Sequence, residues 1–255
     1  MKKKIEDLII TKNQIISNNF NVIEARPVTA LPEILPGQFL QVRVDNDPDS
    51  FLRLPLSVHD VDSRNNTISL LIQTVGSGTR SLSVLKAGDK LNVIYPLGNS
   101  FTLPGKGEKI LLAGGGCGLA PLLYMARKSA EAGADVTVVL GFRNRERILD
   151  HSAFESLGQV FISTEDGSAG TKGFVTDTDV FRKRAWDRVY CCGPEAMMKS
   201  VARECKSRGI FCEVSLENLM ACGLGACLCC VADTVDGHVC ACTDGPVFNV
   251  KSLLW

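Results

Sequence analysis

The sequence has no excess of charge of either sign and no long apolar run. Lysine plus arginine and aspartate plus glutamate both total 28, so the whole chain has no field that would attract nucleic acid or an anionic membrane. No apolar run approaches the ~18 residues of a membrane span. The basic start at residues 1–4 is followed by Glu6 and Asp7, where a signal peptide would place its apolar region. These absences predict a soluble, cytoplasmic protein with a small or local partner.

Histidine is scarce, and the sequence has neither internal repeats nor low-complexity tracts. The three histidines, His59, His151 and His238, are scattered and form no triad or metal set with acids. We expect each to be a surface or capping residue, although His59 follows a candidate binding motif described below. The histidines therefore offer no catalytic machinery.

Length and cysteine content are more informative. At 255 residues with 45% apolar composition, the chain fits two compact domains and a small appendage. Six of its 11 cysteines lie between Cys222 and Cys242. A secreted disulfide scaffold would be short and would carry a leader, so in a reducing compartment this density indicates metal or redox chemistry.

Residues 1–103 have the pattern of an antiparallel β-barrel. Short β-rich runs at 8–10, 39–42, 67–72 and 91–95 are separated by turn sequences such as Pro-Gly at 36–37. The pattern changes near Phe101, and the Pro-Gly-Lys-Gly sequence at 104–107 is a plausible linker.

Residues 104–214 alternate buried strands with helices. A helix with one apolar face starts near Leu119 and ends at Gly133, and a second helix is expected at 195–208. The expected strands are 109–113, 136–140, 160–163, 188–191 and 210–216. This alternation predicts a parallel α/β sheet with ligands at the carboxyl ends of its strands. The remaining 215–255 form a small subdomain rich in cysteine and glycine.

The cysteines of this subdomain have the spacing of a plant-type ferredoxin. Four residues separate Cys222 from Cys227, two separate Cys227 from Cys230, and eleven separate Cys230 from Cys242. This spacing predicts a two-iron, two-sulfide cluster, written [2Fe–2S], bound by these four thiolates. The chain is therefore predicted to be an electron carrier.

Cys229 and Cys240 are the two cysteines of this region that we leave out of the ligand set. Cys229 interrupts the two-residue gap, and Cys242 precedes a Thr-Asp-Gly-Pro turn that could close the loop. Gly223 and Gly225 let the backbone approach the cluster without a Cβ in the way. A structural zinc site and a disulfide knot are the alternatives, although zinc usually takes two thiols two residues apart followed by a distant pair. Either spare cysteine could still replace a ligand.

A glycine-rich segment follows the first strand of the α/β domain and opens its first helix. Its candidate binding residues are Gly114, Gly115, Gly116, Gly118 and Pro121. In this position backbone amides and the helix dipole bind a diphosphate. The segment lacks the regular Gly-x-Gly-x-x-Gly fingerprint, so a plain tight turn between strand and helix is the alternative.

A second turn of this kind, Cys192-Gly193-Pro194, follows the strand at 188–191. Pro194 would occupy the first position of the next helix and leave Cys192 at the strand end, where a ligand ring can lie. A buried structural cysteine is the alternative interpretation of Cys192.

Arg143, Arg145 and Arg147 follow the second strand of the α/β domain, where such sheets set adenosine ribose selectivity. They predict either a site for the 2′-phosphate of NADP or a solvated charged turn, and the sequence leaves both open.

These features together resemble the ferredoxin-reductase superfamily and, more closely, the electron-transfer subunits of heteromeric NAD-linked dihydroorotate dehydrogenases. The matching motifs are Pro-Leu-Ser at 55–57, Val-Gly-Ser-Gly-Thr at 75–79, Glu-Asp-Gly-Ser at 165–168 before Gly173, and 242–248 joined to the cysteine loop. The resemblance covers essentially the whole chain, and the last motif is the most specific.

The resemblance implies that the barrel binds FAD. It assigns to the flavin and its phosphates Arg53, Leu54, Pro55, Leu56, Ser57, Leu71, Ile72, Gln73, Gly78 and Thr79. The family pattern has an arginine three residues before the serine, whereas here Leu54 takes that place and Arg53 is displaced by one. The side chains of Leu71 and Ile72 are expected in the core, with only their backbone near the flavin.

The resemblance assigns NAD to residues 114–121 and to Cys192, Gly193, Pro194 and Met197, with Cys192 near the nicotinamide. It implies an oxidoreductase subunit in which nicotinamide exchanges hydride with FAD, and FAD exchanges single electrons with the cluster. A partner subunit with FMN would oxidise dihydroorotate to orotate in pyrimidine biosynthesis, in a heterotetramer of two subunits of each kind. No general acid or base is expected from this chain, because the cofactors supply the chemistry.

Two other functions stay open. A small subunit of an NADPH–ferredoxin oxidoreductase or of a sulfide-dehydrogenase-like complex resembles the chain in all three modules, and the three arginines support it. The second alternative function is a flavin- or zinc-binding regulatory module without turnover. A colourless protein that contains one zinc ion would identify it.

Overall fold

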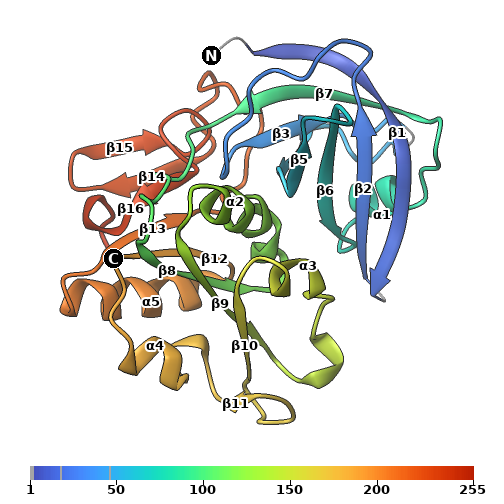
Figure 1. The fold of residues 1–255 in the computed structure, drawn as a ribbon. Helices are drawn as coiled ribbons and strands as arrows, with labels where there is room; N and C mark the ends of the chain where they lie inside the picture. Colours follow the sequence, from blue (N-terminus) through green and yellow to red (C-terminus); the bar gives the residue numbers. More distant parts are fainter. Residues whose placement is uncertain (1–2, 18, 46) are drawn as a thin grey trace.

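The computed structural model describes residues 3–17, 19–45 and 47–255, which form two large sheets and a C-terminal hairpin segment (Figure 1). Residues 1 and 2, at the basic start considered above as a leader, lie outside the described part. Within the described ranges, no helix has the length and apolar character needed to cross a membrane.

The N-terminal part is a curled antiparallel sheet with the strand order β4-β3-β7-β1-β2-β6-β5. Its elements are β1 (Lys4–Ser17), β2 (Phe20–Arg26), β3 (Phe39–Val42), β4 (Leu54–Ser57), β5 (Asp60–Asp62), β6 (Thr67–Gln73), α1 (Ser77–Ser83) and β7 (Lys90–Leu97). The four predicted β-rich runs are confirmed as parts of β1, β3, β6 and β7. Sequence patterns missed β4, because Pro55 weakens any strand prediction and is tolerated here only because β4 is an edge strand.

Side chains alternate between the two faces of this curled sheet, as the period of two residues in a strand requires. Leu40 and Val42 of β3 are fully buried in the core inside the sheet. Phe39 faces the other way and belongs to the same buried cluster as Cys230, Cys242 and other residues of the C-terminal segment. The outer face of β3 is therefore covered by the cysteine-rich segment.

The second sheet has the order β11-β10-β9-β8-β12-β13-β16, and it is parallel except for β16. Its elements are β8 (Lys109–Gly115), η1 (Gly116–Gly118), α2 (Leu119–Glu131), β9 (Asp135–Phe142), η2 (Arg145–Arg147), α3 (Ser152–Glu155), β10 (Gln159–Thr164), β11 (Thr171–Lys172), η3 (Val175–Asp177), α4 (Asp179–Lys183), β12 (Arg188–Cys192), α5 (Glu195–Ser207) and β13 (Phe211–Ser215). The predicted parallel α/β sheet is confirmed. Helices α2 and α5 lie on opposite faces of it (Figure 1).

The strand β8 shows why both faces need a helix. Ile110 and Leu112 pack on the α2 side, whereas Leu111 and Ala113 pack on the α5 side, and all four are fully buried. A strand that is apolar on both faces must be covered on both faces. The expected start of α5 at Glu195 is confirmed, whereas Pro194 is the N-cap of this helix and not its first residue.

The C-terminal segment joins the two sheets. It contains β14 (Val231–Thr234), β15 (Gly237–Cys240), β16 (Val247–Asn249) and η4 (Val250–Ser252), and β16 pairs with β13. On the other side, the backbone N–H and the side-chain amide of Asn99 donate to the carbonyls of Gly245 (2.6 Å) and Asp244 (2.7 Å). The segment thus extends the α/β sheet and contacts the N-terminal sheet.

His59 is not a surface residue, contrary to expectation. It is partly buried, and its Nδ1 lies 2.9 Å from the carbonyl oxygen of Ala120 in α2. Burial lowers the pKa of His59 to about 4, so the folded protein keeps this imidazole neutral. His151 occupies the N-cap position of α3, and His238 is exposed and contacts Asp233 (2.7 Å), as expected of a surface residue.

We expect acid to destabilise the protein through His59. Between pH 6.5 and 4 the unfolded chain binds the proton and the folded chain does not, so stability is complete above 6.5 and decreases as pH falls. From pH 7 to 5.5 this amounts to about 1 kcal/mol. Thermal unfolding of His59→Gln should depend less on pH than that of the unchanged protein. An identical pH dependence for His59→Gln would contradict the assignment.

Candidate functional site

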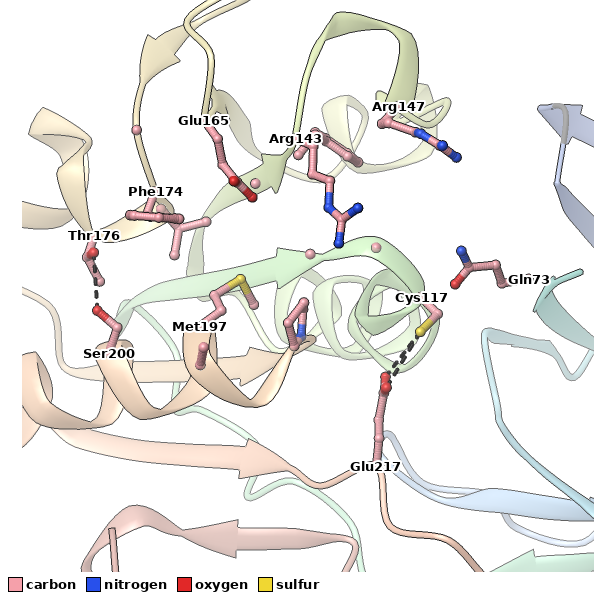
Figure 2. A pocket seen from close by; sticks show the side chains of 18 of the residues that line it. Gln73, Cys117, Arg143, Arg147, Glu165, Phe174, Thr176, Met197, Ser200 and Glu217 are labelled. Carbon is pink, nitrogen blue, oxygen red and sulfur yellow. Dashed lines mark hydrogen bonds between the residues drawn. The ribbon is translucent and has the colours of Figure 1, made fainter. Parts of the chain in front are cut away.

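A cavity of about 670 Å³ lies where the N-terminal sheet meets the carboxyl ends of the parallel strands (Figure 2). Its size is that of a small-molecule or cofactor site. The lining residues come from both sheets and from the segment after β13: Phe20, Gln73, Gly115, Gly116, Cys117, Gly141, Phe142, Arg143, Arg147, Glu165, Gly173, Phe174, Val175, Thr176, Pro194, Ala196, Met197, Ser200 and Glu217. The position agrees with the rule that ligands of open α/β sheets bind beyond the carboxyl ends of the strands.

The glycine-rich segment forms one wall of this cavity. Gly115 ends β8, and Gly116 has a φ of +57°, with open space where a Cβ would stand. Helix α2 follows, and its N-cap Gly118 supplies no capping side chain, so the first N–H groups of α2 have no side-chain partner there. Such a glycine wall at a helix N-terminus suits a diphosphate. Pro121 is buried within α2, and Gly114 packs against the core. These two residues therefore support the glycine wall from behind and do not line the cavity.

The two predicted turns lie in direct contact. A Cβ on Gly118 would stand 2.1 Å from the carbonyl oxygen of Cys192 and 2.5 Å from the nitrogen of Gly193. Met197 closes the same corner, because its sulfur would lie 2.9 Å from a Cβ on Gly115. The structure therefore brings together the residues that were expected to bind NAD, although they come from two different strand ends.

Glu217 is the residue that sequence reasoning missed at this site. Its Oε1 accepts from the thiols of Cys117 (3.4 Å) and Cys192 (3.9 Å), and its side chain points into the cavity (Figure 2). Burial, reinforced by the Glu217 carboxylate, raises the pKa of Cys117 to about 12 and also raises that of Cys192. Both thiols therefore stay protonated at neutral pH. Glu217 lies outside every recognisable motif, and no local pattern pointed to it.

The part of the cavity next to the ends of β9 and β10 is lined by charged side chains of both signs. Arg143 and Arg147 line it from the end of β9, and Glu165 lines it from the end of β10 (Figure 2). Arg145 turns away, because its Nε donates to the carbonyl oxygen of Ser168 (3.1 Å). Two of the three arginines thus line the cavity together with a carboxylate, and the third supports a loop.

The residues expected to bind flavin lie along the edge strand β4 and next to it. All of Leu54–Ser57 is partly exposed, and an edge strand leaves backbone groups free for a ligand. Gly78 brings α1 against this strand, since a Cβ there would lie 3.1 Å from Leu54 Cδ1. The Thr79 hydroxyl accepts from the N–H groups of Val75 and Gly76, both at 3.0 Å.

The other expected flavin residues differ in how they face the site. Leu71 and Ile72 are buried in the core, as predicted for their side chains, whereas Gln73 enters the cavity. The Arg53 guanidinium donates to the carbonyl oxygens of Gln41 (3.2 Å) and Asn92 (3.1 Å) and to Asn92 Oδ1 (2.6 Å). It therefore ties β3 to β7, and a contact with flavin would have to share these bonds.

The four predicted ligand cysteines lie in two pairs. Cys222 is within hydrogen-bonding reach of Cys227, and Cys242 is within reach of Cys230. Across the described residues, no three cysteine, histidine or acidic side chains gather around one point as a single ion would require. A [2Fe–2S] cluster takes four thiolates, two on each iron, which is how these residues are grouped. Cys229 is exposed, and Cys240 also approaches Cys230.

Backbone amides in the cysteine loop point at the thiol sulfurs. The N–H of Leu224 donates to Cys222 Sγ (3.3 Å), and the N–H of Gly225 donates to Cys242 Sγ (3.2 Å). The Leu224 amide is the main reason that the pKa of Cys222 falls to about 6, whereas burial raises the pKa of Cys242 to about 12. A sulfur that accepts amide N–H bonds is stabilised as thiolate, the form that binds iron. These contacts fit an iron–sulfur cluster.

The two loop glycines pack closely against other parts of the chain, and their approach to a cluster stays a prediction. A Cβ on Gly223 would stand 2.5 Å from the Gln41 side chain, and a Cβ on Gly225 would stand 2.8 Å from Thr243. Both glycines also have positive φ, +67° and +82°, which side chains disfavour. The loop therefore needs glycine at both positions.

Comparison with known proteins locates two family matches on this geometry. Residues 112–203 match the oxidoreductase NAD-binding domain, which contains the glycine-rich wall and the Cys192 turn. Residues 217–254 match the iron–sulfur cluster binding domain of dihydroorotate dehydrogenase B, which contains the cysteine pairs and Glu217.

Curated relatives resemble the chain over most or all of its length. The electron transfer subunit of dihydroorotate dehydrogenase B (NAD(+)) from Shouchella clausii is 39% identical over the full length of both chains. The subunit of the same name from Clostridium acetobutylicum is 40% identical over 87% of each chain. A chain from an NADH-dependent reduced ferredoxin-NADP oxidoreductase structure is 32% identical with a TM-score of 0.88, over 97% of this chain and 90% of that one. A cytochrome P450 reductase of Amycolatopsis is 26% identical with a TM-score of 0.69, over 81% of this chain and 67% of that one.

Proposed function

This chain belongs to the family of dihydroorotate dehydrogenase B electron transfer subunits, and from that premise we propose that it passes electrons between a catalytic FMN-containing subunit and NAD⁺ through a [2Fe–2S] cluster and FAD. The partner would oxidise dihydroorotate to orotate in pyrimidine biosynthesis. The observation that carries the proposal is that the paired cysteines and the glycine-walled cavity belong to one connected structure, joined by the segment from Glu217 to β16. The chain is an oxidoreductase subunit.

We assign one cofactor to each part of the chain. Residues 1–103 would hold FAD along β4 and α1, residues 104–214 would hold NAD in the cavity, and residues 215–255 would hold the cluster on Cys222, Cys227, Cys230 and Cys242. When bound, FAD exchanges hydride with nicotinamide and single electrons with the cluster. The cavity wall would bind the dinucleotide phosphates through backbone N–H groups, and the protonated Cys117 and Cys192 would meet the ring without adding charge.

The surface around the cysteine loop supports contact with a partner protein there. Cys227 is exposed, and the nearby Leu219, Leu224 and Leu228 are 87%, 43% and 65% exposed. Neighbouring exposed apolar side chains of this kind mark protein interfaces. We propose that the catalytic subunit covers this loop in a heterotetramer of two subunits of each kind. We also propose that the protein acts in the cytoplasm, because every cysteine in the described part of the chain is free of disulfide bonds.

The proposal is tested by isolating the natural complex and measuring dihydroorotate-dependent reduction of NAD⁺. We expect iron, acid-labile sulfide and FAD in this subunit and turnover only when both subunits are present. A complex with all cofactors loaded that oxidises no dihydroorotate would refute the proposed partner reaction.

A second candidate function is the small subunit of an NADPH–ferredoxin oxidoreductase or a sulfide-dehydrogenase-like complex. It is favoured by the likeness to a chain of the ferredoxin-NADP oxidoreductase structure and by Arg143 and Arg147 in the cavity. Turnover of ferredoxin or sulfide by the isolated complex, without dihydroorotate oxidation, would identify it.

We expect NADH to be preferred over NADPH because Glu165 faces the same end of the cavity as the two arginines. A carboxylate can accept hydrogen bonds from ribose hydroxyls and repels a 2′-phosphate. Glu165→Gln should lower KM for NADPH about tenfold, equivalent to ~1.4 kcal/mol, and leave KM for NADH within a few-fold. Steady-state kinetics with both nucleotides measures this. Asp166→Asn, next to the cavity residue, is the matched control, and equal changes in both variants would contradict the role of Glu165.

A further inference from the structure

Gln41 is a buried side chain whose amide has no hydrogen-bond partner. It is 0% exposed, and both Nε2 and Oε1 lack a partner among the described residues. Leaving a buried polar group unpaired costs about 1–3 kcal/mol, so native proteins rarely do it. Such a group indicates either strain or a bound group that completes its hydrogen bonds.

The direction of the Gln41 side chain follows from the alternation along β3. Leu40 and Val42 point into the core of the curled sheet, so Gln41 points outward with Phe39. On that face Phe39 belongs to the same buried cluster as Cys230 and other residues of the C-terminal segment. The Gln41 amide is therefore directed at the cysteine loop and away from the hydrophobic interior.

Gln41 contacts the loop at Gly223, the residue after Cys222. A Cβ on Gly223 would stand 2.5 Å from Gln41 Cγ and 2.6 Å from Gln41 Nε2. The backbone of Gln41 is held from the other side, because it pairs with Pro55 of β4 and its carbonyl oxygen accepts from Arg53 (3.2 Å). The amide is thus fixed between the edge strand β4 and the cysteine pairs.

We propose that Gln41 Nε2 donates a hydrogen bond to a sulfur atom of the iron–sulfur centre on its Cys222 side, so that Gln41 is a positioning residue that sets the reduction potential of that centre. The inference rests on the proposed cluster and goes beyond its ligands. A donor to a cluster sulfur stabilises the reduced, more negative state, and hydrogen bonds to the sulfurs are among the determinants of cluster potential. It also gives a physical reason for a polar side chain at a fully buried position of β3.

The test is the midpoint potential of the cluster in the complete protein with FAD and cluster loaded, measured by a redox titration followed by electron paramagnetic resonance. Gln41→Met keeps the length of the side chain and removes the donor, and we expect a more negative potential, about tenfold in the equilibrium constant or ~59 mV for one electron. Gln41→Glu replaces the donor by a negative oxygen and should shift the potential further in the same direction.

Gln38→Met is the matched control. Gln38 is also buried and lies three residues earlier, but its amide accepts from the N–H of Leu35 (2.8 Å) and donates to the carbonyl oxygen of Gly98 (2.9 Å). Its replacement removes bonds within the N-terminal sheet and should leave the cluster potential unchanged.

A second measurement detects the hydrogen bond directly. Protein labelled with ¹⁵N at the glutamine side-chain amides should show a ¹⁵N coupling to the reduced cluster by pulsed electron paramagnetic resonance, and Gln41→Met should abolish it. A loaded cluster without this coupling, an unchanged cluster potential in Gln41→Met, or a shift confined to the flavin potential each refutes the role of Gln41. Protein without iron and sulfide would refute the proposed function as well, so the two failures are distinguishable.

Discussion

Replacing Cys227 by serine should remove the cluster and stop electron transfer to the partner while leaving the reduction of FAD by NADH in place. Cys227 is one of two exposed cysteines in the loop and the only one of these two in the predicted ligand set. Serine offers a hard hydroxyl in place of the soft thiolate that iron–sulfur clusters require. Changes that merely disturb the support of a metal ligand reduce affinity or activity ~10–100-fold, and losing a ligand should reduce dihydroorotate-dependent turnover by at least about 100-fold.

Iron and sulfide content, turnover of the reconstituted complex and anaerobic bleaching of FAD by NADH measure these effects separately. Cys229→Gly is the matched control, because Cys229 is the other exposed cysteine and lies outside the predicted ligand set. It should retain full cluster absorbance. If Cys229→Gly loses the cluster and Cys227→Ser keeps it, the ligand assignment is wrong.

Gly118→Ala should have the second largest effect, a loss of NADH binding with FAD and cluster retained. The new Cβ would stand 2.1 Å from the Cys192 carbonyl oxygen and 2.5 Å from the Gly193 nitrogen, and these backbone atoms cannot rotate away. The glycine-rich wall and the Cys192 turn must therefore separate. Overpacking costs ~1–3 kcal/mol, and with ~1.4 kcal/mol per factor of ten we expect about tenfold to a hundredfold weaker NADH binding.

The dissociation constant of NADH, measured with the cofactor-loaded protein, tests this prediction. Gly105→Ala in the linker is the matched control, because a Cβ there would meet only the Glu108 side chain at an ordinary 3.8 Å. Affinity within twofold of the unchanged protein for Gly118→Ala would show that the two turns do not jointly form the dinucleotide site.

Elements with a strong local signal were predicted well. The helix from Leu119 to Glu131 has an apolar face, and Gly133, with a φ of +81°, stands just beyond its end. The strands of the parallel sheet are apolar on both faces and therefore readable as continuous runs. The edge strand β4 was missed, because its pairing with β3 comes from a distant segment and its proline argues against a strand.

The candidate site also has features that the local sequence predicts and features that only tertiary contacts decide. The spacing of the cysteines and the glycine-rich segment are local features, and they were sufficient to predict a cluster-binding loop and a dinucleotide-binding segment. The choice of Cys222, Cys227, Cys230 and Cys242 as ligands, in preference to Cys229 and Cys240, stays a prediction. Arg145 could not be told apart from Arg143 and Arg147, because all three stand in one turn and only tertiary contacts decide that Arg145 binds the Ser168 loop.

By itself, the sequence indicated the three parts of this protein: an antiparallel β-domain, a dinucleotide-binding sheet and a cysteine loop. Each depends on residues close together in the chain, whose spacing limits what the backbone can do. Only the tertiary structure decided that Glu217 meets Cys117 and Cys192, and that Gln41 meets the loop after Cys222. These contacts join segments far apart in the sequence, and the residues next to a lone glutamine or glutamate in the chain do not reveal its partner.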